Sequence, residues 1–144
     1  MLPVHQTVRI LKKLFNLEVM AVQIYRTQVD SLAETGEKSL MVAAMENEEH
    51  HRETFQALLR TRGVSPSVRW PFYWLVGQTL GRSTALFGRK VLLSSDIAFE
   101  DKATREYSEF LHKGNFTDDE RAFISEFLDD EKRHAANWRR LLEN

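Results

Sequence analysis

The chain has 144 residues, no cysteine and a formal net charge of −1. This length suits one domain with its own hydrophobic core, and the lack of cysteine excludes disulfides, thiolate-bound zinc and iron–sulfur clusters. Residues 54–95 include six basic residues and no acidic one, so the rest of the chain is acidic. The first residues lack the apolar core of a signal peptide, and no apolar run reaches the roughly 18 residues of a membrane-spanning helix.

The first two predicted helices form a hairpin. One runs over about 3–33 and the other over about 38–61, with glycine and proline residues at their ends. Apolar residues recur at steps of three and four along both helices. In the first helix Glu18 lies in the middle of this apolar stripe, and in the second helix Glu48 and His51 do. The sequence therefore puts charged side chains on a face that should be buried.

An aromatic segment, WPFYWLVGQTL, follows the first hairpin. It begins at Trp70, and Gly77 and Gly81 interrupt it. A long helix is predicted from about 83 to 113, with Glu100 among its inward positions.

The last helix begins at a T-D-D-E sequence, residues 117–120, which is the pattern of a capping box. Its apolar stripe contains Glu131 and His134, so a lone glutamate followed by Glu-x-x-His occurs twice in the chain. The two offsets differ by one residue, which indicates an internal duplication. We predict an all-α single domain (1–144), a four-helix bundle of two hairpins (about 4–61 and 83–142) joined by residues 62–82.

Residues three apart on an α-helix lie on one face, so each Glu-x-x-His pair can direct a carboxylate and an imidazole to one point. Four converging buried carboxylates cannot all ionise without cations, and two divalent ions supply about four positive charges. This ligand set is typical of ferritin-like di-iron or di-manganese bundles. The predicted metal ligands are Glu18, Glu48, His51, Glu100, Glu131 and His134. The alternative is a set of ordinary polar residues that satisfy one another in the core.

The ligand types favour iron or manganese, although zinc can occupy such a site in a purified sample. We expect two iron ions, because oxygen activation needs a metal that changes oxidation state. Asp130, next to Glu131, is a candidate acceptor for the free ring N–H of a ligating histidine. Tyr25 and Tyr107 each follow a lone glutamate by seven residues and either bond a carboxylate of the site or are core tyrosines.

The basic, aromatic segment between the hairpins suits an amphipathic element on an anionic lipid surface. Alternatively it is an aromatic core helix that covers the bundle, and nucleic-acid binding is the poorest interpretation because no recognition module is visible. The residues predicted to face a membrane are Arg69, Trp70, Phe72, Trp74 and Arg82.

The chain resembles the demethoxyubiquinone hydroxylase family, di-iron enzymes of late ubiquinone biosynthesis in the ferritin-like superfamily. The resemblance spans about residues 14–134. It rests on the following segments: LEVMAVQIYRTQ, ENEEHHRETFQALL, PSVRWPFYWLVGQTLGRSTALFGRK, IAFEDKATREY and DDEKRHAANW. In this comparison the family's metal ligands fall on the six residues named above. One departure is Arg105-Glu106-Tyr107, where the family is expected to have His-His-Tyr.

The resemblance implies a di-iron monooxygenase that uses O2 and an external electron donor to hydroxylate a hydrophobic, demethoxyubiquinone-like polyprenyl quinone or quinol. It also implies peripheral attachment to the cytoplasmic membrane face, or the mitochondrial equivalent in a eukaryote, without nucleic-acid binding. A homo-oligomer is left open. The alternative hypothesis is a ferritin- or rubrerythrin-like iron-binding or peroxide-consuming oxidoreductase, and a third is a membrane-surface or partner-binding module with a structural metal.

Overall fold

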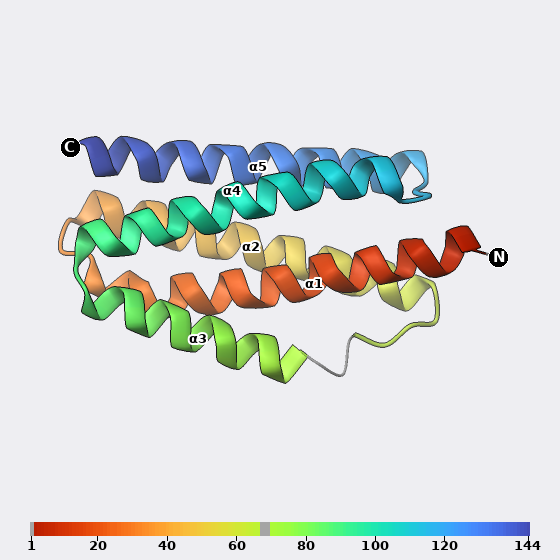
Figure 1. The fold of residues 1–144 in the computed structure, drawn as a ribbon, viewed down its shortest axis with the longest axis horizontal. Helices are drawn as coiled ribbons and strands as arrows, with labels where there is room; N and C mark the ends of the chain where they lie inside the picture. Colours follow the sequence, from red (N-terminus) through yellow and green to blue (C-terminus); the bar gives the residue numbers. More distant parts are fainter. Residues whose placement is uncertain (1, 67–69) are drawn as a thin grey trace.

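The computed structural model describes residues 2–66 and 70–144. Its α-helices are α1 (Leu2–Gln28), α2 (Thr35–Thr61), α3 (Trp70–Leu86), α4 (Arg89–Lys113) and α5 (Asp118–Glu143), and a short 3-10 helix, Val29–Ser31, follows α1. Helices α1, α2, α4 and α5 form the bundle, and α3 runs along the outside of α1 (Figure 1). The prediction of an all-α helical bundle with an extra segment in the crossover is therefore confirmed.

The apolar core is divided into two clusters along the bundle. One cluster includes Leu14 and Phe55, and the other includes Leu93 and Trp138. On α1 the first cluster ends at Val19 and the second begins at Ile24. The polar residues of the predicted metal site therefore lie between two apolar layers, which shield the middle of the bundle from water at both ends.

Three helix boundaries differ from the prediction, and the first of them is the start of α2 at Thr35 instead of about residue 38. The first helix stops at Gln28 instead of about residue 33, and the turn that follows carries Leu32 into the core. The long helix predicted over 83–113 is two helices, because the chain breaks at Gly88 between α3 and α4. Gly88 has a φ of 96°, a conformation that residues with a Cβ rarely adopt, so a helix cannot continue through it.

The start of α5 agrees with the sequence pattern. The Glu120 backbone N–H donates to the Thr117 hydroxyl at 3.2 Å, and the Thr117 backbone N–H donates to the Glu120 carboxylate at 3.0 Å. The predicted capping box is therefore confirmed, and it fixes where the helix carrying Glu131 and His134 begins.

Helix α3 is continuous through Gly77 and Gly81, so the prediction that these glycines interrupt the segment was wrong. They instead allow a close approach of α3 to α1. A Cβ on Gly77 would lie 2.6 Å from the Met20 carbonyl oxygen, and one on Gly81 would lie 2.7 Å from the Ile24 carbonyl oxygen. The small residues, one turn apart, let the two backbones touch and so fix α3 against the helix that carries Glu18.

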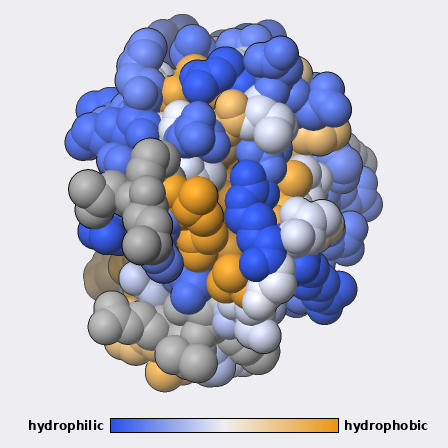
Figure 2. Space-filling model, turned by 90° about the vertical axis from the view of Figure 1, so that its right-hand side faces the viewer, coloured by the Kyte–Doolittle hydropathy of each residue, from blue (hydrophilic) through white to orange (hydrophobic). Residues whose placement is uncertain are grey.

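The outer side of α3 exposes several large apolar side chains. Phe72 is 62% exposed and Leu75 57% exposed, and at the end of the helix Leu86 and Phe87 are exposed to an even greater extent. The end of the bundle near the N-terminus shows mostly hydrophilic residues around a central group of apolar ones (Figure 2). Within the described residues, no helix is long and apolar enough to cross a membrane.

Candidate metal centre

Each of the four bundle helices contributes to one buried polar cluster at mid-height. Helices α1 and α4 each contribute one glutamate, and α2 and α5 each contribute a Glu-x-x-His pair. All six predicted ligands are buried, the most exposed being His134 at 4%. The structure thus brings together Glu18, Glu48, His51, Glu100, Glu131 and His134.

The cluster consists of two overlapping groups of four potential ligands. Glu18 and His51 belong only to the first group, and Glu100 and His134 belong only to the second. Glu48 and Glu131 belong to both, and within each group one ligand atom from every residue lies within 4.8 Å of the others. The arrangement fits two metal ions that share two carboxylates, each ion having one further carboxylate and one imidazole of its own.

The hydrogen bonding of these side chains also fits metal ions. His51 Nδ1 lies 3.2 Å from oxygens of both Glu48 and Glu131, and His134 Nδ1 lies 3.0 Å from Glu48. Despite this proximity, both Nδ1 atoms and both Glu48 oxygens lack a hydrogen bond of good geometry within the described structure. Buried polar atoms left without partners are rare in proteins. Here they surround common points, as metal ligands do.

The pKa values show how poorly the protein alone accommodates these charges. Burial, and then the nearby Glu48 carboxylate, hold the pKa of Glu18 and of Glu131 well above the usual range for a carboxyl group. Burial acts to lower the pKa of His134, but the Glu100 and Glu48 carboxylates raise it to about 10. The cluster therefore favours extra positive charge, which protons supply in the absence of metal and two divalent ions would supply in their place.

The two tyrosines cross between the hairpins. The Tyr25 hydroxyl on α1 donates a hydrogen bond to Glu100 on α4, and the Tyr107 hydroxyl on α4 donates to Glu18 on α1. Glu18 and Glu100, which each belong to only one ligand group, are thereby held through one oxygen by a tyrosine of the other hairpin. This arrangement matches the interpretation that the tyrosines bond carboxylates of the site, and their contribution to metal binding remains a proposal.

Asp130 contacts the histidine of the other hairpin. Its Oδ2 lies 2.9 Å from His51 Nε2 and accepts a hydrogen bond from Asn47 at 3.2 Å, while Oδ1 accepts one from Arg133 at 2.6 Å. Burial acts to raise the pKa of Asp130, but these partners lower it to about 2. An ionised Asp130 favours a proton on His51 Nε2, so that Nδ1 is the ring nitrogen that a metal ion in the cluster would bind.

The two halves of the site differ in ways that the ligand pattern did not predict. Trp138 Nε1 donates a hydrogen bond to the Tyr25 hydroxyl at 3.1 Å, whereas the equivalent position in α2 is Phe55, which only packs against Tyr107. Likewise, the position of Asp130 in α5 is occupied by the uncharged Asn47 in α2. Both differences are visible in the sequence when α2 and α5 are aligned at their offset of 83 residues, although the contacts they make are not.

The predicted membrane-facing residues fall on or before α3. Phe72, Trp74 and Arg82 are exposed on α3, whose other side packs against α1, and their facing a membrane stays a prediction. Arg69 lies outside the described residues, as does the side chain of Trp70.

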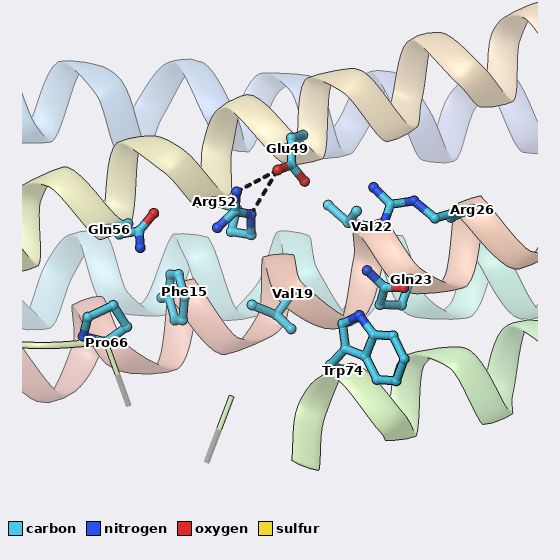
Figure 3. A pocket seen from close by; sticks show the side chains of 10 residues that line it. All are labelled: Phe15, Val19, Val22, Gln23, Arg26, Glu49, Arg52, Gln56, Pro66 and Trp74. Atoms are coloured by element: carbon cyan, nitrogen blue, oxygen red, sulfur yellow. Dashed lines mark hydrogen bonds and ion pairs between the residues drawn. The ribbon is translucent and has the colours of Figure 1, made fainter. Parts of the chain in front are cut away.

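A groove runs between α2 and α3, with α1 as its floor. Its volume is about 320 Å³, and its wall includes Phe15, Val19, Val22, Arg52 and Trp74 (Figure 3). Val19 directly follows the predicted ligand Glu18, and Arg52 directly follows His51. The groove therefore passes along the outer side of the buried glutamate and histidine cluster and ends at the exposed aromatic side of α3.

The four-helix core and its four buried glutamates with two histidines define the class of protein, a ferritin-like bundle of the di-iron carboxylate type. The particular family follows from comparison with known proteins. The chain belongs to the family of the ubiquinone biosynthesis protein COQ7, whose family model matches residues 16–141. The resemblance seen in the sequence is therefore confirmed.

Individual relatives carry hydroxylase names. The chain is 30% identical over 121 residues to the mitochondrial NADPH-dependent 3-demethoxyubiquinone 3-hydroxylase of Dictyostelium discoideum, covering 81% of this chain and 56% of that protein. It is 27% identical over 122 residues to the human protein of the same name, with the same coverage. It is 32% identical over 93 residues to 3-demethoxyubiquinol 3-hydroxylase of Rhodospirillum rubrum, covering 62% of this chain and 42% of that protein. The chain thus spans about half the length of these relatives.

Proposed function

We propose that this protein is a di-iron monooxygenase that hydroxylates the ring of a demethoxyubiquinone-like polyprenyl quinone or quinol. The main supporting observation is the pair of overlapping ligand groups, which share Glu48 and Glu131 in a dry bundle centre. Membership of the COQ7 family adds the substrate class, because the relatives are named for 3-demethoxyubiquinone or its quinol. The same evidence does not favour the alternative of an iron-storing or peroxide-consuming protein.

The overall reaction converts a ring C–H bond to C–OH and reduces O2. One oxygen atom enters the ring and the other leaves as water; an external donor supplies two electrons, and the two protons needed come from the donor and from solvent. We propose NADPH as the source of these electrons because the names of the eukaryotic relatives specify it. Two iron ions would supply the oxygen chemistry. Glu18 and His51 would hold one ion, Glu100 and His134 the other, and the shared carboxylates both.

The protein's own residues position the centre and exclude water from it. Tyr25 fixes one oxygen of Glu100, and Tyr107 fixes one oxygen of Glu18. The second oxygen of each glutamate is thereby left free to bind metal. Asp130 holds the His51 ring, and the rings of His51 and Phe127 stack with centroids 3.9 Å apart. The apolar layers on both sides keep bulk water from the ligands, which strengthens every electrostatic interaction within the site.

We place the quinone ring in the groove of Figure 3. Its apolar wall from Phe15 to Val22 suits a methylated ring and the first prenyl unit, and the Arg26 and Arg52 side chains can donate hydrogen bonds to ring oxygens. From Trp74, at the edge of the groove, the polyprenyl tail would continue along the exposed apolar side of α3.

We further propose that α3 attaches the protein to a membrane surface. Phe72 and Leu75 are exposed on α3, and Arg82 is exposed further along the same helix. Apolar side chains that enter the headgroup region, together with basic residues beside anionic lipid, are the features of an interfacial helix. A substrate with a long apolar tail would reach the groove from that surface.

The test is ring hydroxylation by the iron-loaded chain with a short-chain demethoxyquinone analogue, a reductant and ¹⁸O2, followed by mass spectrometry. The proposal predicts one ¹⁸O atom in the ring for each turnover and loss of product in Glu48→Ala and His134→Ala. If both variants keep full hydroxylation, or if the wild type only consumes peroxide, the assignment is wrong.

A further inference from the structure

A second cavity lies on the other side of α3, between α1, α3 and α4. Its volume is about 290 Å³, and its walls are mostly apolar, formed by side chains such as Ile24, Leu80 and Phe99. It shares no lining residue with the groove of Figure 3. Figure 1 shows the three helices that line it side by side, near the turn that leads from α3 into α4.

The cavity also has a buried acidic residue, Asp96, with no visible role in the fold. Asp96 is 1% exposed and comes one turn before Glu100 on α4. Neither carboxyl oxygen has a hydrogen-bond partner within the described structure, and the same holds for the amide oxygen of Gln28, which also lines the cavity. Burying such atoms without partners is costly, so an apolar residue at position 96 would be the more stable choice.

The nearest polar groups do not relieve this cost. The Gln28 amide nitrogen donates to the Thr84 hydroxyl at 2.7 Å, and Thr84 in turn donates to backbone carbonyls of its own helix. Lys102 lines the cavity but makes its ion pair with Glu106, at 3.6 Å. Burial raises the pKa of Asp96 to about 8, although the neighbouring Gln28 amide acts to lower it. Both carboxyl oxygens of Asp96 and the amide oxygen of Gln28 therefore still lack a hydrogen bond of good geometry within the described structure.

We infer that this cavity is a binding site for a small phenolic ring, whose hydroxyl group bonds Asp96 and Gln28 while the ring packs against Ile24, Leu80 and Phe99. A cavity of about 150 Å³ lined by apolar residues can hold benzene, so this one has room for a ring with substituents. A phenolic hydroxyl both donates and accepts, and it pairs with either the ionised or the neutral form of Asp96. An ammonium group would pair only with the ionised form, which burial disfavours.

This inference goes beyond the proposed function, because it concerns a different cavity and its test requires neither iron nor turnover. The probe is methoxyhydroquinone, added under anaerobic conditions to the metal-free full chain and followed by calorimetry. Its dimethyl ether is the matched compound without donors, and benzylamine is the cationic comparison. We expect the ether to bind about tenfold more weakly, which corresponds to the loss of about one hydrogen bond.

Three variants locate the binding. Asp96→Leu should weaken hydroquinone binding about tenfold and raise the melting temperature, because it removes an unpaired buried acid. Leu80→Trp, at a partly exposed position in the cavity wall, should also weaken binding by filling the space and serves if Asp96→Leu does not fold. Gln56→Leu, in the groove of Figure 3 where we place the quinone ring, should leave binding in this second cavity unchanged and reports only on hydroquinone bound in that groove.

The inference is overturned if Leu80→Trp or a folded Asp96→Leu binds the hydroquinone like the wild type. It is equally overturned if Gln56→Leu abolishes all hydroquinone binding, because the ring would then occupy only the groove of Figure 3. Equal binding of the ether would show a merely apolar cavity, and tighter binding of benzylamine would show that the ligand class is wrong.

Discussion

The shared carboxylates allow a quantitative prediction for Glu131→Gln. Because Glu131 belongs to both ligand groups, its replacement should abolish binding at both metal positions, whereas Glu100→Gln should remove only one. A free metal concentration of about 100 times Kd stabilises a protein by about 2.7 kcal/mol for each site, or about 5 kcal/mol for two. For a chain of this size, about 1 kcal/mol shifts the melting temperature by roughly 2–4 °C.

The assay is thermal unfolding, followed by circular dichroism at 222 nm, of each metal-free protein with and without anaerobic Fe²⁺ or Mn²⁺. We expect the metal to raise the melting temperature of the wild type by roughly 10–20 °C. The increase should be about half as large for Glu100→Gln and almost zero for Glu131→Gln. Without metal, Glu131→Gln should melt no lower than the wild type, since the raised pKa of Glu131 means that a neutral side chain already suits the site. Equal metal-induced shifts in the two variants would refute the shared-carboxylate geometry.

Four further predictions test other parts of the molecule. Gly81→Ala, whose Cβ would meet the α1 backbone, should lower stability by about 1–3 kcal/mol in urea titrations, whereas Gly36→Ala, with open space around it, should not lower it; equal effects would contradict the close contact. Asp130→Asn should weaken metal binding about 10–100-fold at one of the two positions in a calorimetric titration, and uniform weakening at both would count against its role. Since the Asp96 pKa is raised to about 8 by burial, the folded state keeps a proton that the unfolded state loses near pH 4. The wild type should therefore lose stability relative to Asp96→Asn as pH rises from about 4 to 8, and a pH-independent difference in melting temperature would refute this. Phe72→Ser should reduce binding to anionic liposomes about tenfold in a flotation assay without changing the melting temperature, and unchanged flotation would remove α3 from the membrane proposal.

The site was more predictable from sequence than the helix that covers it. Glu18 and Glu48 stand in apolar stripes, and period and spacing alone place such residues at one level of an antiparallel bundle. Helix α3 offered no comparable signal. In the sequence, Gly77 and Gly81 look like interruptions of a helix. A glycine that allows close packing cannot be distinguished there from one that forms a turn, unless the neighbouring backbone is known.

The asymmetry of the site also depended on three-dimensional contacts. Sequence spacing proposed Asp130 as a partner for a histidine but could not say which one, and the structure pairs it with His51 of the other hairpin. Trp138 stood in an apolar stripe, and only the structure shows its N–H donating to Tyr25. Nothing in the sequence marks Asp96 as a buried residue, because its burial depends on α3, whose course along α1 is not encoded in a local pattern.

The central claim is that the cluster binds two metal ions that share Glu48 and Glu131. An anaerobic titration of the metal-free chain with Fe²⁺, followed by Mössbauer spectroscopy after brief exposure to oxygen, tests it most directly. The account predicts two irons per chain, magnetically coupled through shared ligands. One iron per chain, or two irons without coupling, would contradict it.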